Sequence, residues 1–164
     1  MKRLASTMCV GAALGACALF AGAGWGQDAK PSEQPHVVKS PREIKWGDVP
    51  PSLAKGAKIA VMHGDPGKSG PFSVMLKFPP GYRIPAHWHS QDENVVVVSG
   101  VFYAGMGDNI DMTKAVALQR GAYVFMPARM HHFAVTRVPT VIELHGNGPF
   151  DINYVSPADD PQKK

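Results

Sequence analysis

The sequence is divided into short apolar segments by residues that form turns. Residues 72–78, 93–98 and 101–105 are segments of five to seven residues rich in Val and Phe, and a Gly or Pro follows each within two positions. The chain holds 15 prolines and 17 glycines, which break long helices and favour turns. No stretch has the amphipathic pattern of a long helix. We therefore predict an all-β sandwich or barrel and not alternating βαβ units.

The expected strands occupy most of one domain. They are residues 59–63, 72–78, 86–89, 93–98, 101–105, 114–118, 122–126, 131–136, 140–146 and 150–155. A length of 164 residues is enough for one domain with a buried core and too short for two. We place this domain at residues 46–158, after a flexible leader at 27–45 and before a tail at 159–164.

The first 26 residues predict an export signal and not a part of the fold. A basic start, MKR, precedes an apolar run rich in Ala, Gly and Leu, and no acidic residue occurs before Asp28. This pattern is typical of a secretory signal peptide cleaved after Ala23 or Gly26. Two alternatives remain open, a retained membrane anchor and a lipoprotein acylated at Cys17 within LGAC. We expect a periplasmic or secreted protein.

Removal of such a signal changes the chemistry that the chain can perform. Both cysteines, Cys9 and Cys17, lie in the predicted signal, so a mature chain would have no disulfide and no thiolate nucleophile. Without Lys2 and Arg3 the balance is 15 basic against 13 acidic side chains, and no dense basic cluster occurs. We therefore expect neither nucleic acid nor, once the signal is removed, a membrane as partner.

The segment HWHSQDE holds the densest group of metal-binding side chain types. His87 and His89 are two residues apart and share a face of a strand, and Glu93 has the same parity unless a turn at 90–92 breaks the alternation. Two imidazoles and a carboxylate suit Fe²⁺, Mn²⁺, Ni²⁺, Cu²⁺ or Zn²⁺. The alternative interpretation is a solvated turn that happens to contain histidines.

A second pair of histidines lies in PARMHHFAV. His131 and His132 are adjacent, so on a strand they point to opposite faces and only one can reach a given site. A β-bulge could reverse which of the two points inward.

Read together, the two segments resemble the pair of motifs that defines the cupin superfamily. The first has the form G-x5-H-x-H-x3-E-x6-G and the second G-x5-P-x-R-x2-H. The matching positions are Gly81, His87, His89, Glu93, Gly100, Gly121, Pro127 and His132. The sequence departs from the family pattern at Arg129, where Gly is common, and at Thr136, where Asn is common.

The resemblance implies a double-stranded β-helix, a jelly-roll barrel with a metal inside one end. It implies His87, His89, Glu93 and His132 as metal ligands, with one or two coordination positions open to water or substrate. His131 would then face outward. The layout also looks like that of exported bacterial cupins without an assigned activity, and the family implies a homodimer.

Three other residues are candidates for substrate binding or for support of the ligands. Arg129 would carry backbone strain if the family's glycine has a positive φ, and its guanidinium would either be solvated or bind an anionic substrate at the barrel mouth. Glu143 and His145 share one face of a predicted strand. They face solvent if Ile142 and Leu144 form the core, and they are acid/base or supporting groups if their strand lines the pocket.

The favoured function is that of an exported, metal-dependent oxygenase of the dioxygenase type that acts on a small organic molecule. A metal-dependent isomerase or lyase would use the same ligands as a Lewis-acid site. The alternative from another class is a non-catalytic periplasmic protein that captures a small ligand or a metal, because the fold alone specifies no reaction.

Overall fold

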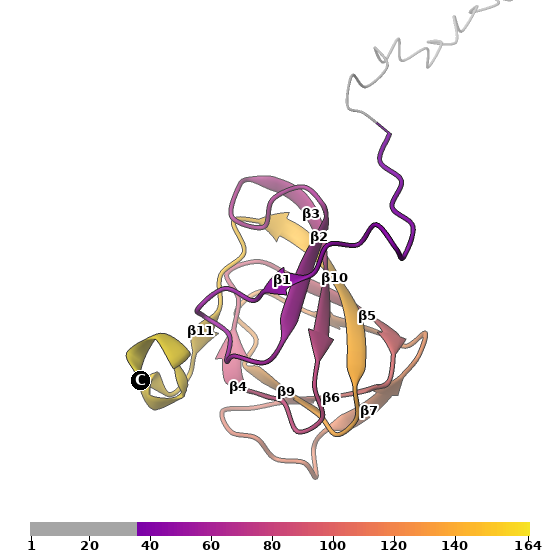
Figure 1. Ribbon diagram of the computed structural model, residues 1–164. Helices are drawn as coiled ribbons and strands as arrows, with labels where there is room; N and C mark the ends of the chain where they lie inside the picture. Colours follow the sequence, from indigo (N-terminus) through magenta and orange to yellow (C-terminus); the bar gives the residue numbers. More distant parts are fainter. Residues whose placement is uncertain (1–35) are drawn as a thin grey trace, which may run out of the picture. The chain divides into compact units, whose positions relative to one another are not determined.

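The structure is a computed structural model that describes residues 36–164 (Figure 1). The predicted signal, both cysteines and the first part of the predicted leader lie outside the described residues. The strands are β1 (Gly47–Asp48), β2 (Lys58–His63), β3 (Gly70–Phe78), β4 (Arg83–Trp88), β5 (Glu93–Ser99), β6 (Val101–Met106), β7 (Val116–Gln119), β8 (Tyr123–Met126), β9 (His132–Thr136), β10 (Thr140–Gly148) and β11 (Asn153–Tyr154). Two 3₁₀ turns follow, η1 (Pro157–Asp159) and η2 (Pro161–Lys163).

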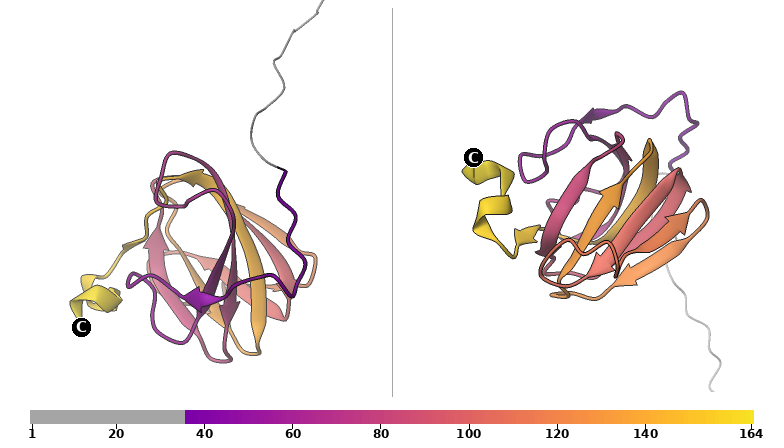
Figure 2. Two further views of the ribbon diagram at one scale, coloured as in Figure 1. Left: turned by 45° about the horizontal axis from the view of Figure 1, so that its top comes forward. Right: turned by 90° about the horizontal axis from the view of Figure 1, so that it is seen from below.

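The strands form two antiparallel sheets. One sheet has the order β1-β2-β3-β10-β5-β8 and the other the order β11-β4-β9-β6-β7. The chain passes repeatedly between the sheets, for example from β3 to β4 and from β4 to β5, and the sheets curve around a common interior (Figure 2). This arrangement confirms the predicted all-β double-stranded β-helix, or jelly-roll barrel.

Alternation along the strands produces the core. In β3, Phe72, Val74 and Leu76 are buried while the residues between them face outward. Ile142 of β10 lies opposite Leu76 in the antiparallel register, and Leu144 lies opposite Val74. Because side chains of period two share one face, both strands present a continuous apolar surface to the interior.

The structure corrects two of the expected boundaries around the site. The strand expected at 86–89 begins three residues earlier, because β4 starts at Arg83 and pairs through Arg83 and Ile84 with β9. Pro85 is accommodated inside β4 because the register shifts between Ile84 and His87, where a missing N–H breaks no ladder hydrogen bond. The strand expected at 131–136 begins one residue later, because β9 starts at His132. His131 therefore precedes the strand.

The end of the chain also differs from the expected strand at 150–155. Only Asn153–Tyr154 pairs with β4, and two 3₁₀ turns follow it. Within residues 36–164, no helical segment has the length and apolar character needed to cross a membrane.

Candidate metal centre

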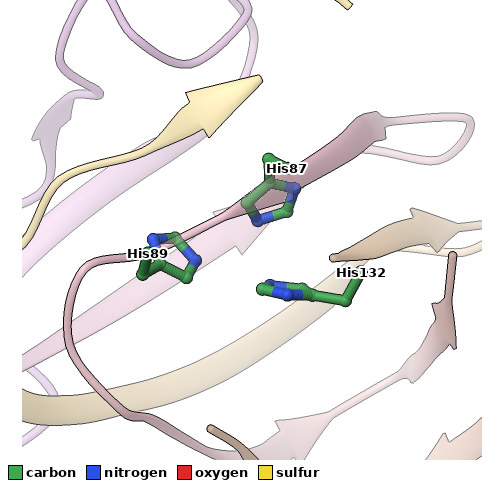
Figure 3. Close-up of side chains that lie close together, drawn as sticks. All are labelled: His87, His89 and His132. Carbon is green, nitrogen blue, oxygen red and sulfur yellow. The ribbon is translucent and has the colours of Figure 1, made fainter. Parts of the chain in front are cut away.

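Three histidines converge inside the barrel. His87 lies in β4, His132 opens β9 directly opposite it in the antiparallel register, and His89 follows the end of β4. One ring nitrogen from each lies within 4.8 Å of those of the other two, and the rings point toward one another (Figure 3). The spacing H-x-H therefore places two imidazoles on one side, and strand pairing brings the third to them.

Glu93 approaches this cluster from the other sheet. It is the first residue of β5, and its Oε2 lies 3.3 Å from Nε2 of His89 and 3.1 Å from Nε2 of His132. All four side chains are buried, with exposed fractions of 3% for His87, 5% for His89, 6% for Glu93 and 3% for His132. Carboxylates and imidazoles with so little exposure are unusual unless they are paired or bind a cation.

Backbone carbonyls set the tautomer of each histidine. Nδ1 of His87 contacts the carbonyl of Pro85 at 2.7 Å, Nδ1 of His89 that of Asp151 at 2.5 Å, and Nδ1 of His132 that of Met130 at 2.9 Å. A carbonyl oxygen only accepts, so each Nδ1 must donate its hydrogen. In the neutral ring the lone pair is then on Nε2, the nitrogen that faces the centre of the cluster.

The inward-facing atoms lack hydrogen-bond partners. Within residues 36–164, Nε2 of His89, Nε2 of His132 and Oε2 of Glu93 are buried without a partner of suitable geometry. Lone pairs and a carboxylate that face each other in a buried site repel and lose hydration. A divalent transition metal would accept electron pairs from these atoms and remove both penalties, so the residues present fit such an ion.

The pKa values of the cluster reflect the same geometry. Burial, reinforced by the neighbouring His132 and His89, lowers the pKa of His87 to about 3. Burial also opposes charge on Glu93 and on His89, but here the neighbours outweigh it. The imidazoles of His132 and His89 hold the pKa of Glu93 well below its usual range, and the Glu93 carboxylate raises the pKa of His89. The carboxylate and the imidazoles are thus electrostatically coupled, and a metal bound by them would compete with protons for the same atoms.

Arg129 adopts the backbone conformation that the sequence departure suggested. Its φ is +65°, the only positive value at a non-glycine residue among residues 36–164. Its backbone N–H donates to the carbonyl of His89 at 2.8 Å, so the strained residue helps to position a member of the cluster. Its side chain is exposed and does not line the cavity.

The other candidates lie away from the cluster. Glu143 and His145 occupy the outer face of β10, where Glu143 accepts from Ser73 Oγ at 2.6 Å and contacts His145 Nδ1 at 2.8 Å. His131 is partly exposed and its Nδ1 contacts Oδ1 of Asp108 at 2.6 Å, and it is not part of the cluster. The structure therefore brings none of these three side chains into the cavity.

Two residues of the C-terminal segment support the site, and the motif spacing did not indicate them. The ring of Phe150 stacks on His89 with centroids 4.3 Å apart and an interplanar angle of 22°. Asp151 accepts from Nδ1 of His89 through its carbonyl, while its carboxylate accepts from the backbone N–H and Oγ of Ser90. Their contact with the site depends on the pairing of β11 with β4, which spacing along the chain does not reveal.

The cluster lies in the wall of a cavity of about 300 Å³ inside the barrel. Apolar side chains from both sheets form most of the lining, among them Leu76 and Ile142 of one sheet and Phe102 and Phe133 of the other. A small cavity with polar groups gathered at one place is the usual form of a site for a small molecule. Fold and site together define a jelly-roll barrel with an internal triad of histidines that could hold a metal ion.

Comparison with known proteins identifies the family. The family model described as ChrR Cupin-like domain matches residues 34–151 of the chain. The chain therefore belongs to this family of the cupin superfamily. No curated protein matches the sequence.

Solved structures share the fold at low sequence identity. The polyketide cyclase RemF from Streptomyces resistomycificus has a TM-score of 0.64 and 18% identity, over 77% of this chain and 89% of that one. An acetylacetone dioxygenase candidate from Methylibium petroleiphilum PM1 has a TM-score of 0.60 and 16% identity. The match covers 80% of this chain and 89% of that one. The DMSP lyase DddQ from Ruegeria pomeroyi DSS-3 has a TM-score of 0.51 and 18% identity. The match covers 65% of this chain and 57% of that one. At such identities the likeness shows the fold alone.

Proposed function

We propose that this chain is an exported, metal-dependent oxygenase of the dioxygenase type that acts on a small organic molecule. The observation that carries the proposal is the convergence of three buried atoms, on His89, Glu93 and His132, that have no hydrogen-bond partner within residues 36–164 and lie at the wall of an apolar cavity. Such an arrangement is costly in a merely structural core and is useful where a cation must be held beside a substrate.

In this proposal His87, His89, Glu93 and His132 hold the metal. A bound Fe²⁺ or Mn²⁺ would supply redox chemistry with O₂ and Lewis acidity toward the substrate. The carbonyls of Pro85, Asp151 and Met130 keep the three Nε2 lone pairs directed inward. The apolar wall excludes water from the reacting groups, which strengthens every electrostatic interaction there.

The structural neighbours are compatible with more than one reaction. One is a candidate for a dioxygenase that acts on acetylacetone and another is a lyase that acts on DMSP, so the same fold is associated with both redox and non-redox chemistry. The donor set of three histidines and a carboxylate also suits a Lewis-acid lyase or isomerase. We place the oxygenase first, and the experiment below separates it from these reactions and from non-catalytic capture.

Metal identity and oxygen consumption test the proposal. The protein is purified from its native compartment for metal analysis, then loaded with Fe²⁺ and assayed for O₂ uptake with catechols, β-diketones and thiols. We expect a transition metal at one ion per chain and O₂ uptake with at least one class. Product formation without O₂ uptake would replace the oxygenase with a lyase or isomerase. Tight retention of one unmodified ligand, with no turnover of any compound, would indicate a capture protein.

Export is part of the proposal and rests on residues 1–26. N-terminal sequencing of the protein from a periplasmic fraction tests it directly. A mature start after Ala23 or Gly26 supports a cleaved signal, acylation of Cys17 would replace it with lipoprotein processing, and an intact Met1 in the cytoplasm would contradict export.

A further inference from the structure

We infer that the cavity selects small apolar molecules in which the only acidic group is the group that binds the metal. Molecules that carry a further carboxylate or phosphate would be excluded. The inference rests on the proposed function, because it places a divalent ion at the histidine cluster. It concerns the rest of the cavity and specifies the class of substrate that the reaction would use.

The lining of the cavity offers no positive charge. None of the residues that line it is Lys or Arg, and the charged residues among them are Glu93 and Asp151. The carboxylate of Asp151 already accepts hydrogen bonds from Ser90. The remaining wall is dominated by aliphatic and aromatic side chains such as Val74, Leu144 and Phe72.

Neighbouring cations are directed elsewhere. Lys68 follows the lining residues Pro66 and Gly67, but its Nζ lies 3.0 Å from Asp65 on the exposed surface. The Arg129 side chain is also exposed and outside the lining, although its backbone supports His89. No Lys or Arg among the described residues is part of the lining, so the wall itself offers no cation for a second anionic group of a bound molecule.

The charge balance of the cluster limits what its metal can neutralise. The carbonyl contacts at Nδ1 define neutral imidazoles as ligands, so a divalent ion together with the Glu93 carboxylate leaves one net positive charge. One anionic donor, such as an enolate or a phenolate, brings this charge to zero. A second negative charge against an apolar wall loses its hydration without gaining a partner, which corresponds to weaker binding by roughly 100-fold or more.

The size of the cavity adds a second limit. Its volume of about 300 Å³ is at the lower end of the range for small-molecule sites. A molecule that fills it can occupy little space beyond its metal-binding head and a compact apolar body.

Matched pairs of chelating compounds test the inference without any catalysis. The protein is loaded with Zn²⁺, which has no redox chemistry, and binding is measured by calorimetry. One pair is 4-methylcatechol and 3,4-dihydroxybenzoate, and the other is 4-methylbenzoylacetone and its 4-carboxy analogue. In each pair a methyl group is exchanged for a carboxylate away from the chelating head. We expect the methyl compound of at least one pair to bind roughly 100-fold or more tighter than its carboxylate partner.

A designed cation provides the matched control. Leu53 lines the cavity and is partly buried, so Leu53→Lys introduces a positive charge at the wall. Val116 lies on β7 with 62% exposure and outside the lining, and Val116→Lys adds the same charge there. We expect Leu53→Lys to reduce the preference for the methyl compounds to tenfold or less and Val116→Lys to leave it unchanged.

The results separate this inference from the proposed function. Equal or tighter binding of the carboxylate compounds by wild-type protein overturns the inference, and so does an absence of binding by all four compounds. In both cases the metal site stands if Zn²⁺ is bound at one ion per chain. Failure to bind Zn²⁺ at all overturns the proposed function itself. The comparison of pairs on wild-type protein decides the question even where Leu53→Lys does not fold.

Discussion

Replacement of Arg129 with glycine tests whether the positive φ at this position stores strain. The residue has φ +65°, where a side chain with a Cβ costs about 1–2 kcal/mol relative to glycine. Glycine also stabilises the unfolded chain by about 0.4–1 kcal/mol because it has more conformations to lose on folding. The difference predicts that Arg129→Gly raises the free energy of unfolding by about 0.5–1 kcal/mol, or Tm by roughly 1–4 °C.

Arg129→Ala is the control for the side chain. Alanine keeps the Cβ and hence the strain, and it removes only an exposed guanidinium. We expect its free energy of unfolding to lie within about 0.5 kcal/mol of wild type. Both variants are measured by urea denaturation of metal-free protein at one pH, with the m-value used to check that the unfolding transition is comparable.

Two results would contradict this reasoning. A glycine variant no more stable than the alanine variant would show that the positive φ costs no more than the entropy that glycine adds to the unfolded chain, about 0.4–1 kcal/mol. A loss of metal stoichiometry in both variants would show that the guanidinium supports the site. We expect full stoichiometry in both, because the N–H that donates to the His89 carbonyl belongs to the backbone and survives either substitution.

Three further predictions concern the cluster. His132→Ala should abolish stoichiometric metal binding by equilibrium dialysis, whereas His131→Ala, which removes only the contact with Asp108, should retain it; the reverse pattern would show that the motif alignment is wrong. Asp151→Ala should weaken metal affinity by about 10–100-fold, because the segment that orients His89 loses its contacts with Ser90; unchanged affinity in a metal titration would remove that positioning role. The metal-free protein should lose stability as pH falls below about 6.5, since the pKa of His87 is lowered to about 3 and the unfolded state binds a proton first. The expected loss is about 1.6 kcal/mol between pH 6.5 and 5, and denaturation midpoints that do not change over this range would contradict it. The raised pKa of His89 acts in the opposite direction only above its unfolded value and leaves this window unaffected.

The sequence predicted the parts of the molecule that depend on local spacing. The apolar segment 72–78 before a turn and the two faces of 140–146 indicated strands, and the structure shows both strands in the core. The spacing of His87 and His89, together with the motif position of His132, predicted which imidazoles lie together. Their role as metal ligands, and that of Glu93, stays a prediction until a metal is measured.

Features that depend on contacts between distant segments were not predictable in this way. The position of Pro85 inside β4 requires a register shift against β9, and nothing in the residues around it specifies that shift. The contact of Phe150 and Asp151 with His89 spans about sixty residues of chain and relies on a paired segment of two residues. Arg129 was informative for another reason. The sequence has Arg where the cupin pattern commonly has Gly, and this departure marked a residue with a positive φ.

The proposed ligands do not all belong to one sheet. His87 and His132 lie on the five-stranded sheet, whereas Glu93 begins a strand of the six-stranded sheet. A single ion bound by all of them would cross-link the two halves of the barrel, in a chain with no cysteine among residues 36–164. Metal binding would then be linked to folding. Free metal at 100 times its Kd would add about 2.7 kcal/mol to the free energy of unfolding of the barrel. The lifetime of the protein in its compartment would therefore report the availability of the metal there.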